Sequence, residues 1–152
     1  MKGFSRHILL WLLLVCAPAV SCRKPDTMES FCRVEMKQDG MYRFEVDMTD
    51  SLRCYDIDFY ARVDGRSVYK AFPLDVEWVS PSGLKYGERV YFRPGPRKSR
   101  SAMSRQLIER YRTGIEPVEP GIWKIGIAAD TPGLRGIGIV FRSRERQWDT
   151  TN

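Results

Sequence analysis

Apolar and polar side chains alternate one by one through several segments of this chain, and this pattern favours a fold built from strands. Successive side chains on a strand point to opposite faces, so alternation leaves one face apolar and the other polar. The pattern is cleanest at residues 42–48 and 55–63. Shorter segments of the same character are 31–36, 74–79, 89–92, 123–127 and 136–141. We therefore expect roughly seven short strands.

Turn residues between these segments favour antiparallel pairing, most clearly at residues 64–65 and 80–83. Sheets with one apolar and one polar face pack in pairs. The sequence thus predicts an all-β domain over residues 32–145: an antiparallel β-sandwich of immunoglobulin-like or jelly-roll type. A small closed barrel is the alternative. Gly136 and Gly138 lie inside a strand pattern, which indicates a bulge or a close approach of backbones.

Residues 97–113 interrupt the alternation and carry six basic side chains against one acid, Glu109. The six are Arg97, Lys98, Arg100, Arg105, Arg110 and Arg112. Residues 104–110 are compatible with a short helix whose Leu107 and Ile108 turn inward. The segment is either a solvated helical insertion or a docking face for an anionic partner, such as a lipid head group or an acidic protein.

Residues 1–21 have the organisation of a secretory signal peptide: a basic head, an apolar run at residues 8–15, and small residues before Cys22. The apolar run is much shorter than the roughly 20 residues that span a bilayer. A cysteine directly after the small residues is typical of a bacterial lipobox. We therefore expect Cys22 to be lipidated and to anchor the mature chain to a membrane. The alternative is an ordinary secreted protein, cut near Ala19 or Ser21.

Removal of residues 1–21 leaves 131 of the 152 residues, enough for one domain with a sizeable core. A lipidated tether at residues 22–31 and a polar tail at residues 146–152 would flank that domain. The net charge falls from +6 to +4 because Lys2 and Arg6 are removed, and this mildly basic balance permits an anionic partner. No nucleic-acid-binding motif is present, and we expect no nucleic-acid partner for an exported chain.

Two cysteines remain for the folded domain, Cys32 and Cys54, because Cys16 leaves with the signal peptide and Cys22 takes the lipid. In an oxidising compartment a disulfide between them is possible, and it would stabilise the fold by about 3 kcal/mol. The alternative is a pair of buried, reduced thiols. The choice depends on whether the two Cα atoms come within reach of each other.

Few residues are available for catalysis. The chain's one histidine, His7, lies in the signal peptide, so the mature domain lacks imidazole for catalysis or for zinc binding. The acid pairs Asp56/Asp58 and Asp75/Glu77 alternate with apolar residues, as on the solvent face of a strand. We expect no enzymatic activity, no metal, no cofactor and no small-molecule substrate.

The tryptophans of the mature chain allow a second interpretation. Trp78 and Trp123 share strand faces with aliphatic residues, which favours a place in the core. The alternative is a surface carbohydrate-binding sandwich, in which exposed aromatic rings stack on sugars. Trp148 lies in the polar tail.

A series of short motifs runs through the chain in a defined order. They are Tyr55-Asp56-Ile57 with Arg62, Leu74-Asp75-Val76, Ser80-Pro81-Ser82-Gly83, Glu88-Arg89-Val90-Tyr91-Phe92, Tyr111-Arg112-Thr113-Gly114-Ile115, Pro120-Gly121-Ile122-Trp123-Lys124-Ile125 and Leu134-Arg135-Gly136-Ile137-Gly138-Ile139. Together with the lipobox, this order resembles the gliding-motility lipoprotein GldH family of the Bacteroidota over residues 40–142.

The resemblance implies a lipid-anchored, non-catalytic accessory protein of the cell envelope. Its implied partners are the membrane and envelope proteins of the gliding-motility and type IX secretion machinery. One site residue carries over, Cys22, and no catalytic residue does. The basic segment at residues 97–112 has no counterpart in the family pattern. Arg23 and Lys24 follow Cys22 in place of the acidic run that resembles a surface-export signal, which favours the periplasmic side of the outer membrane.

Overall fold

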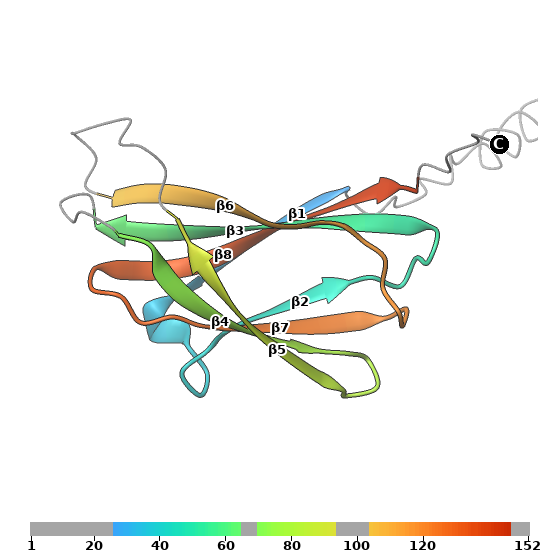
Figure 1. Ribbon diagram of the computed structural model, residues 1–152, viewed down its shortest axis with the longest axis horizontal. Coiled ribbons are helices and arrows are strands. Elements are labelled where there is room, and N and C mark those ends of the chain that lie inside the picture. The colour runs from blue at the N-terminus through green and yellow to red at the C-terminus, as the bar shows by residue number, and fades with distance from the viewer. Residues whose placement is uncertain (1–25, 65–69, 94–103, 147–152) are drawn as a thin grey trace, which may run out of the picture.

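The computed structural model describes residues 26–64, 70–93 and 104–146, and these form two antiparallel sheets packed face to face (Figure 1). The elements are β1 (Thr27–Arg33), η1 (Val34–Met36), β2 (Tyr42–Asp47), β3 (Arg53–Asp64), β4 (Phe72–Val79), β5 (Lys85–Phe92), β6 (Ser104–Ile115), β7 (Ile122–Ala128) and β8 (Leu134–Glu145). The predicted antiparallel β-sandwich is confirmed. No helix within the described ranges has the length and apolar character needed to cross a membrane.

The strand order is that of a jelly roll. One sheet runs β1-β8-β3-β6 and the other β2-β7-β4-β5. The pairs β1–β8, β2–β7, β3–β6 and β4–β5 are each hydrogen-bonded neighbours, as if one long hairpin had been wound into a sandwich. Of the two sandwich types that the sequence left open, the topology therefore selects the jelly roll.

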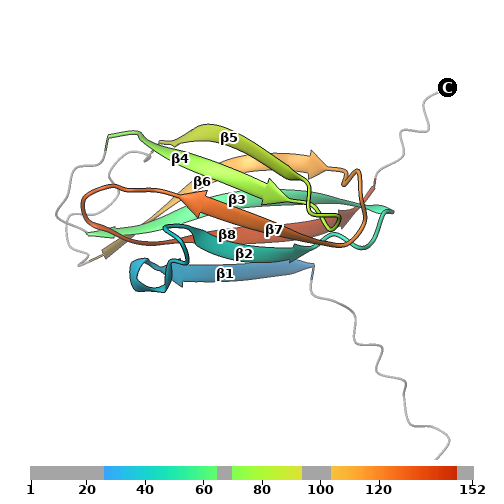
Figure 2. The same cartoon turned by 90° about the horizontal axis from the view of Figure 1, so that it is seen from below.

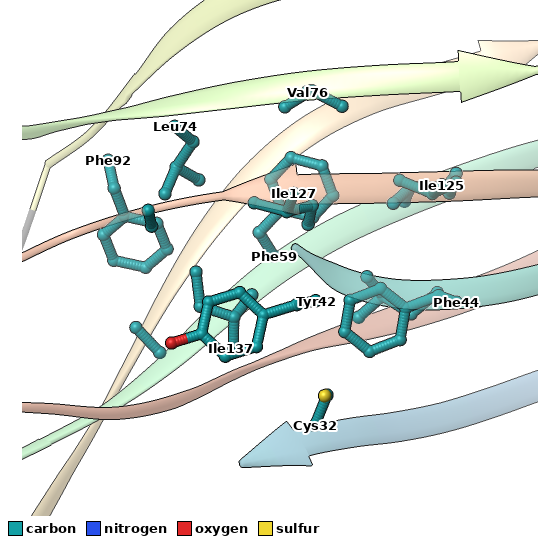
Figure 3. Packing of buried hydrophobic residues seen from close by; sticks show 14 of the residues in the cluster. Cys32, Tyr42, Phe44, Phe59, Leu74, Val76, Phe92, Ile125, Ile127 and Ile137 are labelled. Carbon is teal, nitrogen blue, oxygen red and sulfur yellow. The ribbon is translucent and has the colours of Figure 1, made fainter. Parts of the chain in front are cut away.

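The core lies between the sheets and uses the alternating residues that the sequence marks. On β2, Tyr42, Phe44 and Val46 are buried while the residues between them are not. Figure 3 shows Phe44 and Ile125 among the side chains that pack together in the core. A full jelly-roll domain can bury such faces without help from a metal or a disulfide, since each sheet covers the other.

Gly136 and Gly138 of β8 allow the close approach that their pattern predicts. A Cβ atom at Gly136 would lie 2.5 Å from the carbonyl oxygen of Cys32. One at Gly138 would collide with the ring of Tyr60, which stacks on Phe31 at a centroid distance of 5.7 Å. The outer face of this sheet is therefore partly covered by its own aromatic side chains.

The helix predicted over residues 104–110 is wrong. The segment is the first part of β6, an edge strand paired antiparallel to β3. Strand geometry sends neighbouring side chains to opposite faces, so Leu107 packs against the core while Ile108 is 60% exposed. Pairing with β3 supplies the backbone hydrogen bonds that a helix would have supplied internally.

The predicted boundary between tether and domain needs correction. Strand β1 begins at Thr27 and pairs with β8, so residues 27–31 belong to the sandwich and not to the tether.

The two cysteines of the domain, Cys32 and Cys54, are both free thiols. They lie opposite positions 137 and 144 of β8, seven residues or about 23 Å apart along that strand. A disulfide needs Cα atoms within about 7 Å, so of the two alternatives that the sequence left open, the structure has the pair of buried, reduced thiols and not the bridge.

The antiparallel pairing of β1 with β8 brings the start of one strand beside the end of the other (Figure 2). The connections at residues 48–52, 80–84 and 116–121 lie at this same end of the sandwich. We call it the tether end, because the chain enters the fold there.

Candidate functional site

A cleft of about 650 Å³ opens at the tether end, between β5 of one sheet and β6 of the other. It combines aromatic and aliphatic side chains with charged groups from both sheets and from the β6–β7 connection. It is lined by Met48, Trp78, Tyr86, Gly87, Glu88, Arg112, Thr113, Gly114, Ile115, Glu116, Pro117, Val118 and Trp123. Its size lies within the range of about 300–1,000 Å³ that is usual for ligand sites.

The floor of the cleft is formed by inward-facing aromatic side chains of the β2-β7-β4-β5 sheet. Trp78 of β4 lies between Ile125 of β7 and Tyr86 of β5 in the strand register. The rings of Trp78 and Trp123 meet edge to face at 6.0 Å, and Tyr86 lies 6.3 Å from Trp123. Trp123 is buried and Trp78 half-buried, but Tyr86 is 48% exposed. The inner face of the sheet is thus uncovered at this corner.

The predicted place of Trp78 and Trp123 beside the core is confirmed, and both also line the cleft. The sequence did not predict the role of Tyr86, Glu88 and Tyr111. Tyr111 lies in the basic segment at residues 97–113, directly after the residues that were expected to be helical. Once that segment is a strand, its alternation points Tyr111 toward Trp78.

A hydrogen-bonded network forms the wall of the cleft and joins the two sheets. The indole N–H of Trp78 donates to the Tyr111 oxygen at 2.8 Å, and the Tyr111 hydroxyl donates to Glu88. Arg112 donates to the same carboxylate at 2.7 Å. Phe59 stacks on Tyr111 at 4.1 Å, which fixes the phenol ring against the core.

Burial and hydrogen bonds together set the protonation of this network. Desolvation, and then the hydrogen bond to Glu88, raise the pKa of Tyr111 to about 12. Burial also favours the neutral form of Glu88, but hydrogen bonds from Tyr111 and Arg112 outweigh it and lower the pKa of Glu88. At neutral pH the phenol therefore stays protonated and the carboxylate charged. This protonation pattern is suited to holding a fixed shape and is poorly suited to exchanging protons with a substrate.

Two more polar groups around the cleft have partners within the fold. The indole N–H of Trp123 donates to the backbone oxygen of Glu119 at 2.9 Å. Glu116, on the rim, pairs with Arg146 at 3.2 Å. The free surface of the cleft is consequently mostly apolar. Over the described ranges, no group of three or more His, Cys, Asp or Glu side chains is arranged to hold a metal ion.

The two acid pairs do not both lie on a solvent face. Asp75 does, in an exposed pair with Arg89 at 2.6 Å. Asp58 is only 7% exposed, and Arg142 donates to it at 3.0 Å while Arg110 lies 3.9 Å away. Expecting Asp58 to be solvated was wrong, because arginines from both neighbouring strands cover it. The Asp56 carboxylate accepts a hydrogen bond from a backbone N–H of β6.

The predicted anionic-partner face is only partly within the described residues. Arg97, Lys98 and Arg100 lie outside them, as does the side chain of Arg105. Arg110 and Arg112 are on β6 and are each paired with a carboxylate of the fold, Asp58 and Glu88 respectively. An anionic-partner face made of all six residues stays a prediction.

The lipidation site predicted at Cys22 also lies outside the described residues, as does Trp148. No family model matches the sequence, and no curated protein matches it either.

Proposed function

We propose that this chain is a lipid-anchored, non-catalytic accessory protein of the cell envelope that acts by binding another envelope component. Cys22 provides the anchor, and the cleft between β5 and β6 provides the binding site. The observation that carries the proposal is the uncovered aromatic corner at the tether end, where Trp78 and Tyr86 face open space of about 650 Å³. A monomer that needed no partner would gain stability by covering such a surface.

The resemblance to the GldH family supports the kind of partner. It implies proteins of the gliding-motility or type IX secretion machinery, with the chain on the periplasmic side of the outer membrane. The tether is short: Cys22 stands five residues before Thr27, where β1 begins. Five extended residues span about 18 Å at most, so an anchored domain would keep its tether end, and the cleft, near the bilayer.

A photocrosslinking side chain tests the cleft directly. In place of Tyr86 it would lie inside the cleft, and in place of Tyr91 it would lie on the same strand, comparably exposed but outside it. In native envelopes we expect protein adducts from position 86, with motility or secretion proteins among them, and few from position 91. Equal adducts from both positions, or none from position 86, would contradict the proposal.

The anchor has its own test. Labelled palmitate should enter the wild-type protein, and the Cys22→Ser variant should lose both the label and its partition into membranes. A variant that stays membrane-bound would show that something other than Cys22 holds the chain there.

Carbohydrate binding is the second candidate function, favoured by the half-exposed Tyr86 and half-buried Trp78 beside a groove. Jelly-roll sandwiches also serve as lectin domains, although a shared fold is only an analogy. A glycan array tests it: binding that is lost in Tyr86→Ala and kept in Tyr91→Ala would support a sugar site in the cleft. Absence of binding to any glycan would remove this candidate.

A further inference from the structure

Exposed aliphatic side chains gather on the three connections of the tether end. Leu52, Leu84 and Val118 each lie in a different one, at residues 48–52, 80–84 and 116–121, and Val118 is 86% exposed. Figures 1 and 2 show these connections together at the end of the sandwich where β1 begins. Single exposed aliphatic residues are common on protein surfaces, but a group of them at one end indicates a contact surface. We call these three residues the apolar rim.

Contacts among the connections hold the apolar rim in place. The Ser82 hydroxyl donates to Glu119 at 2.8 Å and joins the second connection to the third. The backbone N–H of Met48 donates to the carbonyl oxygen of Gly121 at 2.9 Å and joins the first connection to the third. The backbone that carries the rim is therefore ordered before anything binds, which reduces the entropy cost of binding.

The chain enters the fold beside the apolar rim. The carbonyl oxygen of Asp26 accepts a hydrogen bond from the backbone N–H of Ser143 at 2.8 Å. The Asp26 carboxylate accepts another, also at 2.8 Å, from Arg53, the residue after Leu52. Asp26 is thus fixed next to the rim, and Cys22 precedes it by four residues, which span about 14 Å when extended. A bilayer that holds a lipid on Cys22 consequently lies within reach of the rim.

The charges on the three connections indicate which lipid surface the rim fits. These connections hold three acids, Asp50, Glu116 and Glu119, and no basic residue. Glu116 pairs with Arg146 at 3.2 Å and Asp50 lies 3.7 Å from Arg53, so nearby cations offset part of this charge. Contact with a membrane must then come from the apolar side chains, since an anionic surface would not attract this end of the molecule. Lipid head groups without net charge fit it best.

We propose that the apolar rim inserts into the head-group layer of the bilayer that holds Cys22, so that the sandwich stands on its tether end. This inference rests on the proposed function, because the lipid on Cys22 keeps the rim next to the membrane. Three aliphatic side chains would bind a bilayer weakly on their own, but a short tether gives them a high effective concentration at its surface. Val118 also lines the cleft, so the cleft opens at the level of the membrane surface. A partner would then be recognised by a segment that lies close to the bilayer.

Quenching by spin-labelled lipids tests the insertion on the full-length lipidated chain in vesicles of phosphatidylcholine. A fluorescent side chain replaces Leu84 or Val118 of the rim, or Met36 as the matched control. Met36 is 60% exposed and Leu84 59%, but Met36 lies in η1, at the opposite end of the sandwich. With the nitroxide just below the head groups, we expect several-fold more quenching at positions 84 and 118 than at position 36. Equal quenching at all three positions would overturn the inference.

Two changes to this experiment check that the contact is apolar. The double variant Leu52→Ser, Leu84→Ser should lower the quenching at position 118 at least about two-fold, whereas Met36→Ser should leave it unchanged. These side chains are all exposed, so neither variant should unfold at a lower urea concentration. Replacing part of the phosphatidylcholine with phosphatidylglycerol should not increase the quenching. An increase would show that charge, and not the apolar rim, draws this end of the molecule to the membrane.

Flotation of the same vesicles separates this inference from the proposed function. If the wild-type chain floats with the vesicles but is not quenched at positions 84 and 118, the insertion is refuted and the anchor at Cys22 stands. A Cys22→Ser variant that floats equally well and is quenched at both positions would support the insertion and contradict the anchor in the proposed function.

Discussion

The two long sides of the sandwich differ in how completely they bury their inward-facing side chains. The strands along both sides carry inward-facing aromatic residues. On the side of β1 and β2, the strands pack against each other, and Tyr42, Phe44 and Val46 are fully or almost fully buried. Lys37 closes this side further by donating to the carbonyl oxygen of Ala129 at 2.9 Å. We call it the closed side.

On the side of β5 and β6, which we call the open side, the inward-facing Tyr86 stays 48% exposed. The sheets are joined there by the network of Trp78, Tyr111, Glu88 and Arg112. The difference teaches that alternation determines which face a side chain points to, and that the packing of the partner sheet determines whether that face is covered. Surface left uncovered in this way is available for binding.

The largest expected effect is a difference in the stability lost when one aromatic side chain is truncated on each side. Phe44→Ala on the closed side should lower the free energy of unfolding by about 3–5 kcal/mol, since it leaves a cavity in a packed core. Tyr86→Ala on the open side should cost about 1 kcal/mol, because its ring is already half in water. Urea unfolding of the mature domain measures both. Similar losses at the two positions would contradict the distinction between the sides.

The next effect concerns the network that joins the sheets on the open side. Tyr111→Phe removes one hydroxyl, and the Trp78 indole N–H and the Glu88 carboxylate each lose a partner. We expect a loss of about 1–3 kcal/mol in unfolding free energy. Tyr91→Phe is the matched control, since Tyr91 is 56% exposed on β5, the strand that also carries Glu88. If both variants unfold at the same urea concentration, the network does not hold the sheets together.

Acid should weaken the open side before the closed side. The pKa of Glu88 in the folded protein is lowered below 4.5 by its hydrogen bonds from Tyr111 and Arg112, which outweigh burial. Its stabilising contribution is therefore present above pH 4.5 and is lost as the pH falls through the lower pKa of the folded state. Glu88→Gln should flatten this part of the stability profile, measured by urea unfolding at a series of pH values. An unchanged slope would show that Glu88 titrates as it does in the unfolded chain.

The smallest effect is expected on the outer face of the same sheet. The pKa of Asp75 is lowered by its hydrogen bond with Arg89, but both side chains are largely solvated. Such exposed ion pairs contribute little to the free energy of unfolding, because water and salt screen their charges. Asp75→Asn should leave the urea midpoint almost unchanged, and added salt should remove any remaining difference. A loss as large as that from Tyr111→Phe would show that the outer face matters more than its exposure indicates.

The sequence predicted the sandwich because alternation records burial on one face, and β2 and β4 follow it closely. It missed β6 because charged and polar side chains interrupt the apolar alternation there, and because the adjacent Leu107 and Ile108 are equally compatible with a helix. What makes the segment a strand is its pairing with β3, which is a tertiary contact. The burial of Asp58 was missed for a similar reason: the covering side chain of Arg142 is 84 residues away in the chain.

The candidate site was only half predictable. Trp78 and Trp123 could be placed on the inner face from their aliphatic neighbours. The cleft itself depends on how far the two edge strands stand apart at one corner, and a pattern within single strands does not contain that distance. Tyr86 and Glu88 alternate on β5 as ordinary core-facing residues do, so their exposure emerged only with the packed sheets.

The position of β1 has a mechanical consequence. It is an edge strand whose hydrogen-bonded neighbour in the sheet is β8, and the chain enters it at Thr27. A pull on the preceding residues, directed away from the sheet, loads the hydrogen bonds to β8 one after another, starting at Thr27. Peeling of this kind takes less force than sliding two strands past each other, where all the bonds share the load. Under tension from its N-terminal side, the first part of the molecule to give way is therefore the strand that the tether enters, while the corner formed by β4, β5, β6 and β7 keeps its shape.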